Sequence, residues 1–134
     1  RSLSRLGLER RTTLYGNVTS EELRALYRQS EVLAVPSFEG FGIVYLEAMS
    51  YGLPVVATTA GAAHEIVDNQ ANGFLTPPGD AKAIGAAITK LAGNRELLCR
   101  MGVAARDRYD GHPTWHETFA EAQTWLWELA GRKG

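Results

Sequence analysis

The spacing of apolar residues changes repeatedly along the chain, and this pattern predicts an α/β fold. Residues 32–35 are apolar throughout, as expected for a strand that is buried on both faces of a parallel sheet. Three further segments, residues 12–15, 54–58 and 73–76, also have the composition of strands. Apolar residues at helical spacing separate the strands and fill the last third of the chain. The pattern therefore predicts one layer of parallel strands with flanking helices and a helical C-terminal segment.

Capping residues and glycines place the helix ends. Residues 1–10 are consistent with the end of a helix near Gly7, and Gly52 is placed to end a helix over residues 42–51. Thr19 and Glu22 have the spacing of a capping box, which predicts a helix over residues 20–29. The apolar face of that helix, expected to cover a sheet, consists of Leu23, Leu26 and Tyr27. The later helices are predicted to begin after Asp80, Asn94 and Thr114, the last with Glu117 in a second capping box.

Composition and charge exclude several functions. The chain has 134 residues, 45% of them hydrophobic, which is enough for one domain with a real core. Its 14 basic and 15 acidic residues are scattered and leave no basic stripe beyond Arg10-Arg11, so nucleic-acid binding has little electrostatic support. The single cysteine, Cys99, has no partner for an internal disulfide, and no apolar run approaches the ~20 residues of a membrane span.

These features favour a cytoplasmic protein, with the cytoplasmic face of a membrane as an alternative. The chain begins at Arg1 without a signal-peptide pattern, and we interpret it as an excised piece of a longer protein. Residues 1–134 contain no repeat or linker, and they are predicted to form a single partial domain.

The stretch over residues 36–49 has the strongest chemical character. It follows the apolar strand, turns at glycines around Glu39, and continues as a helical pattern that contains Glu47. In parallel α/β sheets ligands bind where strands end and helices begin, because backbone N–H groups there favour anions. This order predicts a ligand that carries phosphate.

The same stretch resembles the donor-binding domain of a known enzyme family. Glu39 and Glu47 are separated by seven residues within PSFEGFGIVYLEAMSYGLPVVAT, and the segments Glu65-Ile66-Val67 and Gly73-Phe74-Leu75 follow. Together these residues resemble the C-terminal half of the donor domain of retaining, GT-B-fold, family-4 glycosyltransferases. The resemblance extends from about Leu6 to Trp127 and implies a partial Rossmann-like domain that binds a nucleotide sugar, such as a UDP-sugar or a GDP-sugar, without a cofactor.

The resemblance also implies a role for each site residue. Glu39 is expected to meet the hydroxyls of the donor sugar and to be catalytic, and Glu47 is expected to accept hydrogen bonds from the ribose. Backbone groups facing the sugar and diphosphate would come from Gly40, Phe41, Gly42 and Ile43. The nucleobase would lie at Gly16, Asn17 and Val18. A carboxylate accepts two hydroxyl donors and glycine allows close approach of the backbone, so the residue types suit these roles.

Plainer interpretations remain for these residues. Glu39 would also serve as a helix cap, and Glu47 as a solvated helix residue. His64 is as consistent with an ordinary surface histidine as with a ligand contact. His112 and His116 lie near Glu117, but no third ligand converges on them, so no metal site is predicted.

The family pattern also includes parts without a counterpart in this sequence. They are an N-terminal acceptor domain, two further strands, and an arginine and a lysine that neutralise the donor diphosphate. The chain by itself is therefore expected to be inactive, and residues 12–15 and 32–35 would be the third and fourth strands of a sheet ordered 3-2-1-4-5-6. The edge at residues 32–35 would then be exposed, which predicts self-association. A non-catalytic nucleotide-binding or assembly module and a nucleotide-sugar epimerase are the alternative functions.

Overall fold

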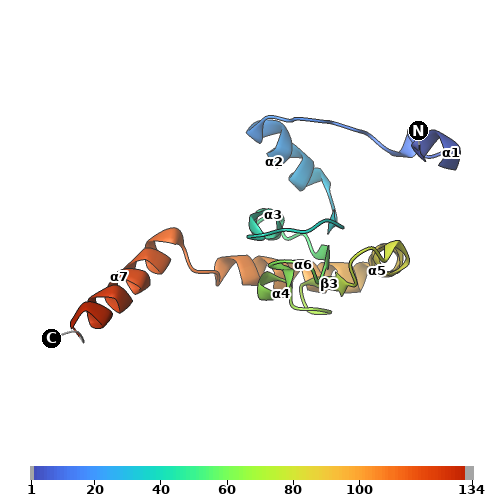
Figure 1. Ribbon diagram of the computed structural model, residues 1–134. Coiled ribbons are helices and arrows are strands. Elements are labelled where there is room, and N and C mark those ends of the chain that lie inside the picture. Colours follow the sequence, from blue (N-terminus) through green and yellow to red (C-terminus); the bar gives the residue numbers. More distant parts are fainter. Residues whose placement is uncertain (1, 132–134) are drawn as a thin grey trace. The chain divides into compact units, whose positions relative to one another are not determined.

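The computed structural model describes residues 2–131, and these fall into two compact units, one that ends at residue 30 and one that begins at residue 31 (Figure 1). The first unit contains helix α1 (Ser2–Leu6), the short 3₁₀ helix η1 (Glu9–Arg11) and helix α2 (Ser20–Gln29). Gly7 ends α1 with a positive φ of 65°, as its position in the sequence predicted. The capping box of α2 is confirmed, because the Glu22 carboxylate accepts from the Thr19 backbone N–H at 2.7 Å while Thr19 Oγ1 accepts from Glu22 N–H.

The predicted strand over residues 12–15 is wrong. This segment has no regular secondary structure, and the side chains of Leu14 and Tyr15 are exposed. A strand requires a partner for its N–H and C=O groups, and no described strand pairs with these residues. The proposed position of this segment as the third strand of a doubly wound sheet is therefore wrong as well.

The second unit is built on a three-stranded parallel sheet with strand order β1-β2-β3. The strands are β1 (Leu33–Val35), β2 (Val55–Thr58) and β3 (Gly73–Thr76). All four residues of β2 are buried, as expected for a central strand covered on both faces. Between the strands lie α3 (Ile43–Met49) and α4 (Ala63–Ile66), and the α/β class predicted from the sequence is confirmed.

Helices α5 (Ala81–Ala92) and α6 (Arg95–Asp110) cover one face of the sheet. Val56 and Phe74 are partners in the sheet register and so point to the same face. Their apolar contacts on the two helices are Ala87, Leu91, Leu97, Leu98 and Met101. The predicted N-caps are confirmed, since Asp80 and Asn94 each accept a hydrogen bond of 2.9 Å from a backbone N–H three residues later.

Strand β1 differs from the prediction for residues 32–35. Leu33 is half-buried, Ala34 is exposed and Val35 is buried, so the side chain of Ala34 is not covered and burial on both faces was the wrong expectation. β1 is also the edge of the described sheet and pairs only with β2, so one side of its backbone lacks ladder partners there. Self-association through this edge stays a prediction.

Helix α6 forms hydrogen bonds to the ends of α3 and α4, the helices that precede β2 and β3. Arg106 donates to the Ser50 carbonyl at 2.6 Å, and Arg108 donates to the Glu65 carbonyl at 2.7 Å. Gly52, at the end of α3, has a φ of 71°, and a side chain at Gly102 of α6 would lie 2.6 Å from the Gly52 carbonyl oxygen. The two glycines thus allow the backbones of α3 and α6 to approach closely.

Helix α7 (Trp115–Gly131) starts at the predicted capping box, where the Glu117 carboxylate accepts from the Thr114 backbone N–H at 2.7 Å. None of its described residues is buried. The apolar side chains of α7 therefore form a largely open surface, with Trp115, Phe119, Leu126 and Leu129 all exposed. No described helix is long and apolar enough to cross a membrane.

Candidate functional site

The Glu39 loop, residues 36–42, connects the end of β1 to the start of α3. It is held against the segment that follows β2, where Glu39 forms an isolated parallel bridge with Gly61. The Glu39 carbonyl accepts from the Ala62 N–H at 2.9 Å. The backbone at Glu39 is therefore fixed by the neighbouring strand connection, so the position of its carboxylate depends on residues 61 and 62.

Gly61 allows this contact because it lacks a side chain. Its φ is 74°, in the left-handed region, and a Cβ there would collide with the Glu39 carbonyl oxygen. The structure thus gives Gly61 a role in the site that the sequence analysis did not predict.

Gly42, at the end of the Glu39 loop, also allows a close contact because it lacks a side chain. Its φ is 69°, and a Cβ would lie 2.5 Å from Ile66 Cδ1 and 3.0 Å from the Tyr45 ring. Gly42 is buried, and Gly40 is exposed. A Cβ added at Gly40 would have only Phe38 Cε1 nearby, at 3.9 Å. A ligand can therefore approach the backbone closely at Gly40, whereas Gly42 has to be glycine because it packs against Ile66 and Tyr45.

The two predicted carboxylates lie on either side of the start of α3. Glu39 is half-buried, and its carboxylate has no hydrogen bond or ion pair with the described residues. Glu47 is exposed on α3, and its carbonyl accepts from Ser50 Oγ at 2.6 Å. The structure thus places both carboxylates on one short strand-loop-helix segment, with Glu39 fixed in the loop and Glu47 on the helix.

Tyr45 lies beneath the loop and is fully buried, and its hydroxyl has no hydrogen-bond partner among the described residues. Burial raises the pKa of this phenol above its ordinary value, and the negative charge of Glu39 raises it further. Tyr45 therefore stays neutral at physiological pH and forms an apolar support for Gly42.

The predicted nucleobase turn belongs to the first unit. Gly16 has a φ of 63° with open space around it, and Asn17 is exposed while Val18 is half-buried. The positive φ explains the glycine as a turn residue. The role of these three residues toward a nucleobase stays a prediction.

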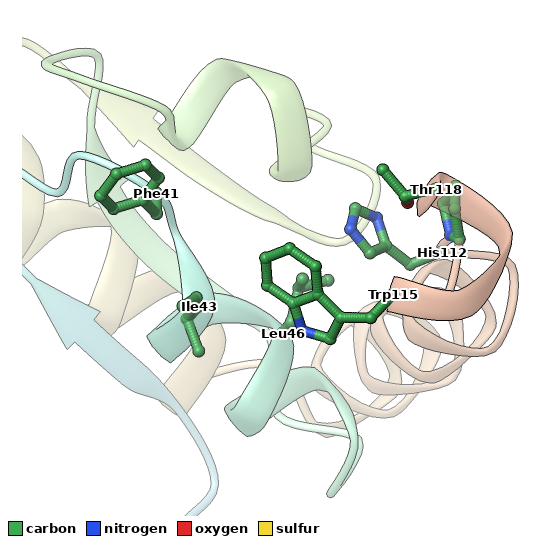
Figure 2. A pocket seen from close by; sticks show the side chains of 7 residues that line it. Phe41, Ile43, Leu46, His112, Trp115 and Thr118 are labelled. Atoms are coloured by element: carbon green, nitrogen blue, oxygen red, sulfur yellow. The ribbon is translucent and has the colours of Figure 1, made fainter. Parts of the chain in front are cut away.

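A cavity of about 520 Å³ adjoins the Glu39 loop between the start of α3 and the connection from α6 to α7. Its lining consists of Phe41, Ile43, Leu46, His112, Pro113, Trp115 and Thr118. In Figure 2, Phe41 and Ile43 lie on one side, His112 and Thr118 lie on the other, and the indole of Trp115 extends between them. The sequence analysis considered Phe41 for its backbone and rejected His112 as a metal ligand, and it did not bring these two residues together with Trp115.

Comparison with known proteins identifies the family. A family model described as "Glycosyl transferases group 1" matches residues 1–108. The chain belongs to this glycosyltransferase family. The resemblance inferred from the Glu39 and Glu47 motif is thereby confirmed.

Individual relatives agree with this assignment. The D-inositol 3-phosphate glycosyltransferase of Nocardia farcinica is 33% identical over 96% of the chain and 29% of its own length. The GDP-mannose-dependent alpha-(1-6)-phosphatidylinositol monomannoside mannosyltransferase of Mycobacterium tuberculosis is 29% identical over 90% of the chain and 33% of its own length. The chain thus spans about a third of the length of these relatives.

Solved structures show the same fold. Sucrose-phosphate synthase from Thermosynechococcus elongatus matches 99% of the chain and 33% of its own length, with a TM-score of 0.82 and 30% identity. Anabaena HepE in complex with UDP matches 96% of the chain and 35% of its own length, with a TM-score of 0.78 and 28% identity. The fold is that of part of the C-terminal donor-binding domain of a GT-B glycosyltransferase, as predicted.

Proposed function

We propose that this chain binds the nucleotide-sugar donor of a retaining glycosyltransferase. The observation that carries the proposal is the Glu39 loop, in which contacts to residues 61 and 62 hold the backbone of Glu39, the Glu39 carboxylate has no partner among the described residues, and Gly40 nearby is open. The solved complex of HepE with UDP supports a nucleotide ligand for this fold. An unpaired carboxylate beside accessible backbone suits a ligand with hydroxyls and phosphates.

In this proposal Glu39 accepts hydrogen bonds from hydroxyls of the donor sugar, while the backbone of residues 40–43 faces the sugar and diphosphate. Glu47, one turn into α3, accepts from the ribose. The acceptor oxygen forms its bond to the anomeric carbon as the bond from that carbon to the diphosphate breaks, and the acceptor proton passes to the departing diphosphate. The protein contributes positioning and stabilisation of charge.

Replacement of Glu47 tests the ribose contact. We expect Glu47→Ala in the intact protein to weaken binding of the nucleoside diphosphate by on the order of 1.5–3 kcal/mol, because charge-assisted hydrogen bonds to the ribose are lost. Calorimetric titration with UDP and with GDP measures the change, and Glu128→Ala, at an exposed position on α7, is the matched control. Unchanged affinity in a folded Glu47 variant would remove this residue from the ribose site.

Replacement of Glu39 separates sugar contacts from nucleotide contacts. We expect Glu39→Gln to lower turnover about tenfold while affinity for free nucleoside diphosphate changes much less, because the proposed partner of Glu39 is the sugar. Turnover is followed as nucleoside diphosphate released from the nucleotide sugar. Equal losses in both quantities would indicate that Glu39 only shapes the loop. Nucleotide binding without any transfer in the intact wild-type protein would favour a non-catalytic binding module.

A further inference from the structure

We propose that two arginines of helix α6 position the two carboxylates of the donor site independently of each other. Arg106 holds α3, which carries Glu47, and Arg108 holds α4, which contacts the Glu39 loop. This inference rests on the proposed donor function and deepens it, because both arginines lie outside the site whose geometry they fix. Each acts through another element, so they are positioning residues and not catalytic ones.

The contact of Arg106 lies at the C-terminal end of α3. Its Nη1 atom donates to the carbonyl of Ser50, the residue that caps α3, at 2.6 Å. Carbonyl groups at a helix C-terminus lack an N–H partner within the helix, and the helix dipole favours a cation there. Glu47 lies in the same last turn, and its carbonyl accepts from the Ser50 hydroxyl at 2.6 Å. Arg106 therefore holds the turn from which the Glu47 side chain extends.

The contact of Arg108 lies on α4, the single helical turn that follows β2. Arg108 Nη2 donates to the Glu65 carbonyl at 2.7 Å. The same turn supports the Glu39 loop twice, because the Ala62 N–H donates to the Glu39 carbonyl at 2.9 Å and Ile66 lies next to the last residue of the loop. A helix of four residues is not stable by its own hydrogen bonds, so α4 depends on contacts from other elements. Arg108 supplies such a contact from α6.

Each guanidinium is oriented by the side chain four residues later in the chain. The Asp110 carboxylate accepts from Arg106 Nε and Nη2, both at 2.8 Å. His112 Nδ1 lies 3.4 Å from Arg108 Nη1 and is the acceptor, because arginine only donates. Residues two apart on a helix do not share a face, so the two arginines reach different helices. The two contacts thus have separate orienting groups and separate targets, and each can be removed without the other.

The exposure of these groups separates local positioning from global stability. The side chains of Arg106 and Asp110 are about half exposed, and exposed ion pairs contribute little to the stability of a whole domain. The core beneath them consists of apolar residues of the sheet, α5 and α6. Loss of one arginine contact is therefore expected to loosen the end of one short helix while the core stays folded.

Hydrogen exchange tests the two contacts without any ligand. Arg106→Met and Arg108→Met are compared with the wild type in the intact protein by NMR, since methionine keeps an apolar stem and lacks the donors. We expect Arg108→Met to speed exchange of the Ala62 amide, which donates to the Glu39 loop, about tenfold and to leave the Ser50 amide in α3 unchanged. Arg106→Met is expected to have the opposite pattern.

Nucleotide binding and transfer provide the functional measurements. We expect Arg106→Met to weaken binding of UDP or GDP about tenfold with a smaller change in turnover at saturating donor, because Glu47 is the proposed ribose contact. Arg108→Met is expected to lower turnover about tenfold with a smaller loss of nucleotide affinity, because it acts on the Glu39 loop. Lysine at either position restores a cation with a donor and is expected to recover part of the loss.

Arg100→Met is the matched control, because Arg100 is exposed on the same helix and its side chain forms no hydrogen bond with the described residues. Asp110→Ala and His112→Ala leave both arginines in place and are expected to reproduce the Arg106 and Arg108 patterns more weakly. These two variants decide the question if an arginine variant does not fold.

The proposal is overturned if the Arg106 and Arg108 variants change both amides equally, if they lower affinity and turnover in the same proportion, or if they behave like Arg100→Met. A wild-type protein that binds neither UDP nor GDP would contradict the donor function. The exchange measurements would still decide whether the two arginines hold α3 and α4, so the two failures are distinguishable.

Discussion

Gly61→Ala is expected to lower turnover of the intact protein at least about 100-fold, with a smaller loss of affinity for free nucleoside diphosphate. A Cβ at this position would collide with the Glu39 carbonyl oxygen, so the Glu39 loop has to move away from residues 61 and 62. Displacement of a reacting or binding group by about 1 Å is enough to cost 100-fold in rate. Glu47 lies on α3 outside this contact, so the proposed ribose interaction is expected to survive, while the proposed contact of the loop backbone with the diphosphate is weakened.

The matched control for this variant is Gly79→Ala. Gly79 also has a left-handed φ, of 79°, but it has open space where a Cβ would lie. It carries the conformational cost of a side chain in this region, on the order of 1–2 kcal/mol, without the collision. Release of nucleoside diphosphate from the nucleotide sugar and calorimetric titration are measured for both variants. Equal turnover in the two variants would show that the contact between Gly61 and Glu39 does not position the carboxylate.

The elements that the sequence predicted well are those whose ends are set by local chemistry. The boundaries of α2 and the N-caps of α5 and α6 follow from side chains that bond to backbone N–H groups three residues away. Strand β3 begins and ends where predicted, at Gly73 and Thr76. Such interactions lie within a few residues of sequence, so the sequence is sufficient to specify them.

The elements that were predicted wrongly depend on distant partners. Residues 12–15 have strand composition, but β propensity is expressed only when another strand pairs with the segment, and none does among residues 2–131. Likewise, the apolar pattern of residues 32–35 indicated burial on both faces, whereas Ala34 is exposed at the sheet edge. Composition indicates that burial is favourable but does not identify what covers the residue.

The site was predicted only in part, because some of its contacts are local in the sequence and others depend on distant segments. Glu39 and Glu47 belong to one contiguous motif, and the structure places them on one loop and helix. Gly61 and the cavity were missed because their partners come from separate segments. Phe41 and Trp115 are 74 positions apart in the sequence, and their presence in one cavity depends on how α6 packs against α3 and on the hydrogen bond from Arg108 of α6 to the Glu65 carbonyl of α4. A run of small residues around Gly61 was the available signal, but the collision that makes glycine necessary there is visible only in three dimensions.

Gly73→Ala is expected to destabilise the fold by about 3 kcal/mol or more, which is at the upper end of overpacking costs. Gly73 opens β3 in register with Val55 of the buried strand β2. A Cβ there would collide with the Val55 carbonyl oxygen and lie 2.9 Å from Val67 Cγ1, and neither backbone nor buried valine has room to move. The added methyl group therefore has to separate the two strands, which weakens the ladder that supports both the core and the segment contacting the Glu39 loop.

Chemical denaturation followed by circular dichroism measures this effect, and Gly85→Ala provides the matched control. Gly85 lies inside α5 with open space around it, so alanine there is expected to stabilise the helix by up to about 1 kcal/mol. The two substitutions thus add the same methyl group and are expected to change the free energy of unfolding in opposite directions. A Gly73 variant that unfolds at the same denaturant concentration as the wild type would show that β2 and β3 adjust to the methyl group without cost, and the tight pairing of these strands would then contribute nothing to holding the site.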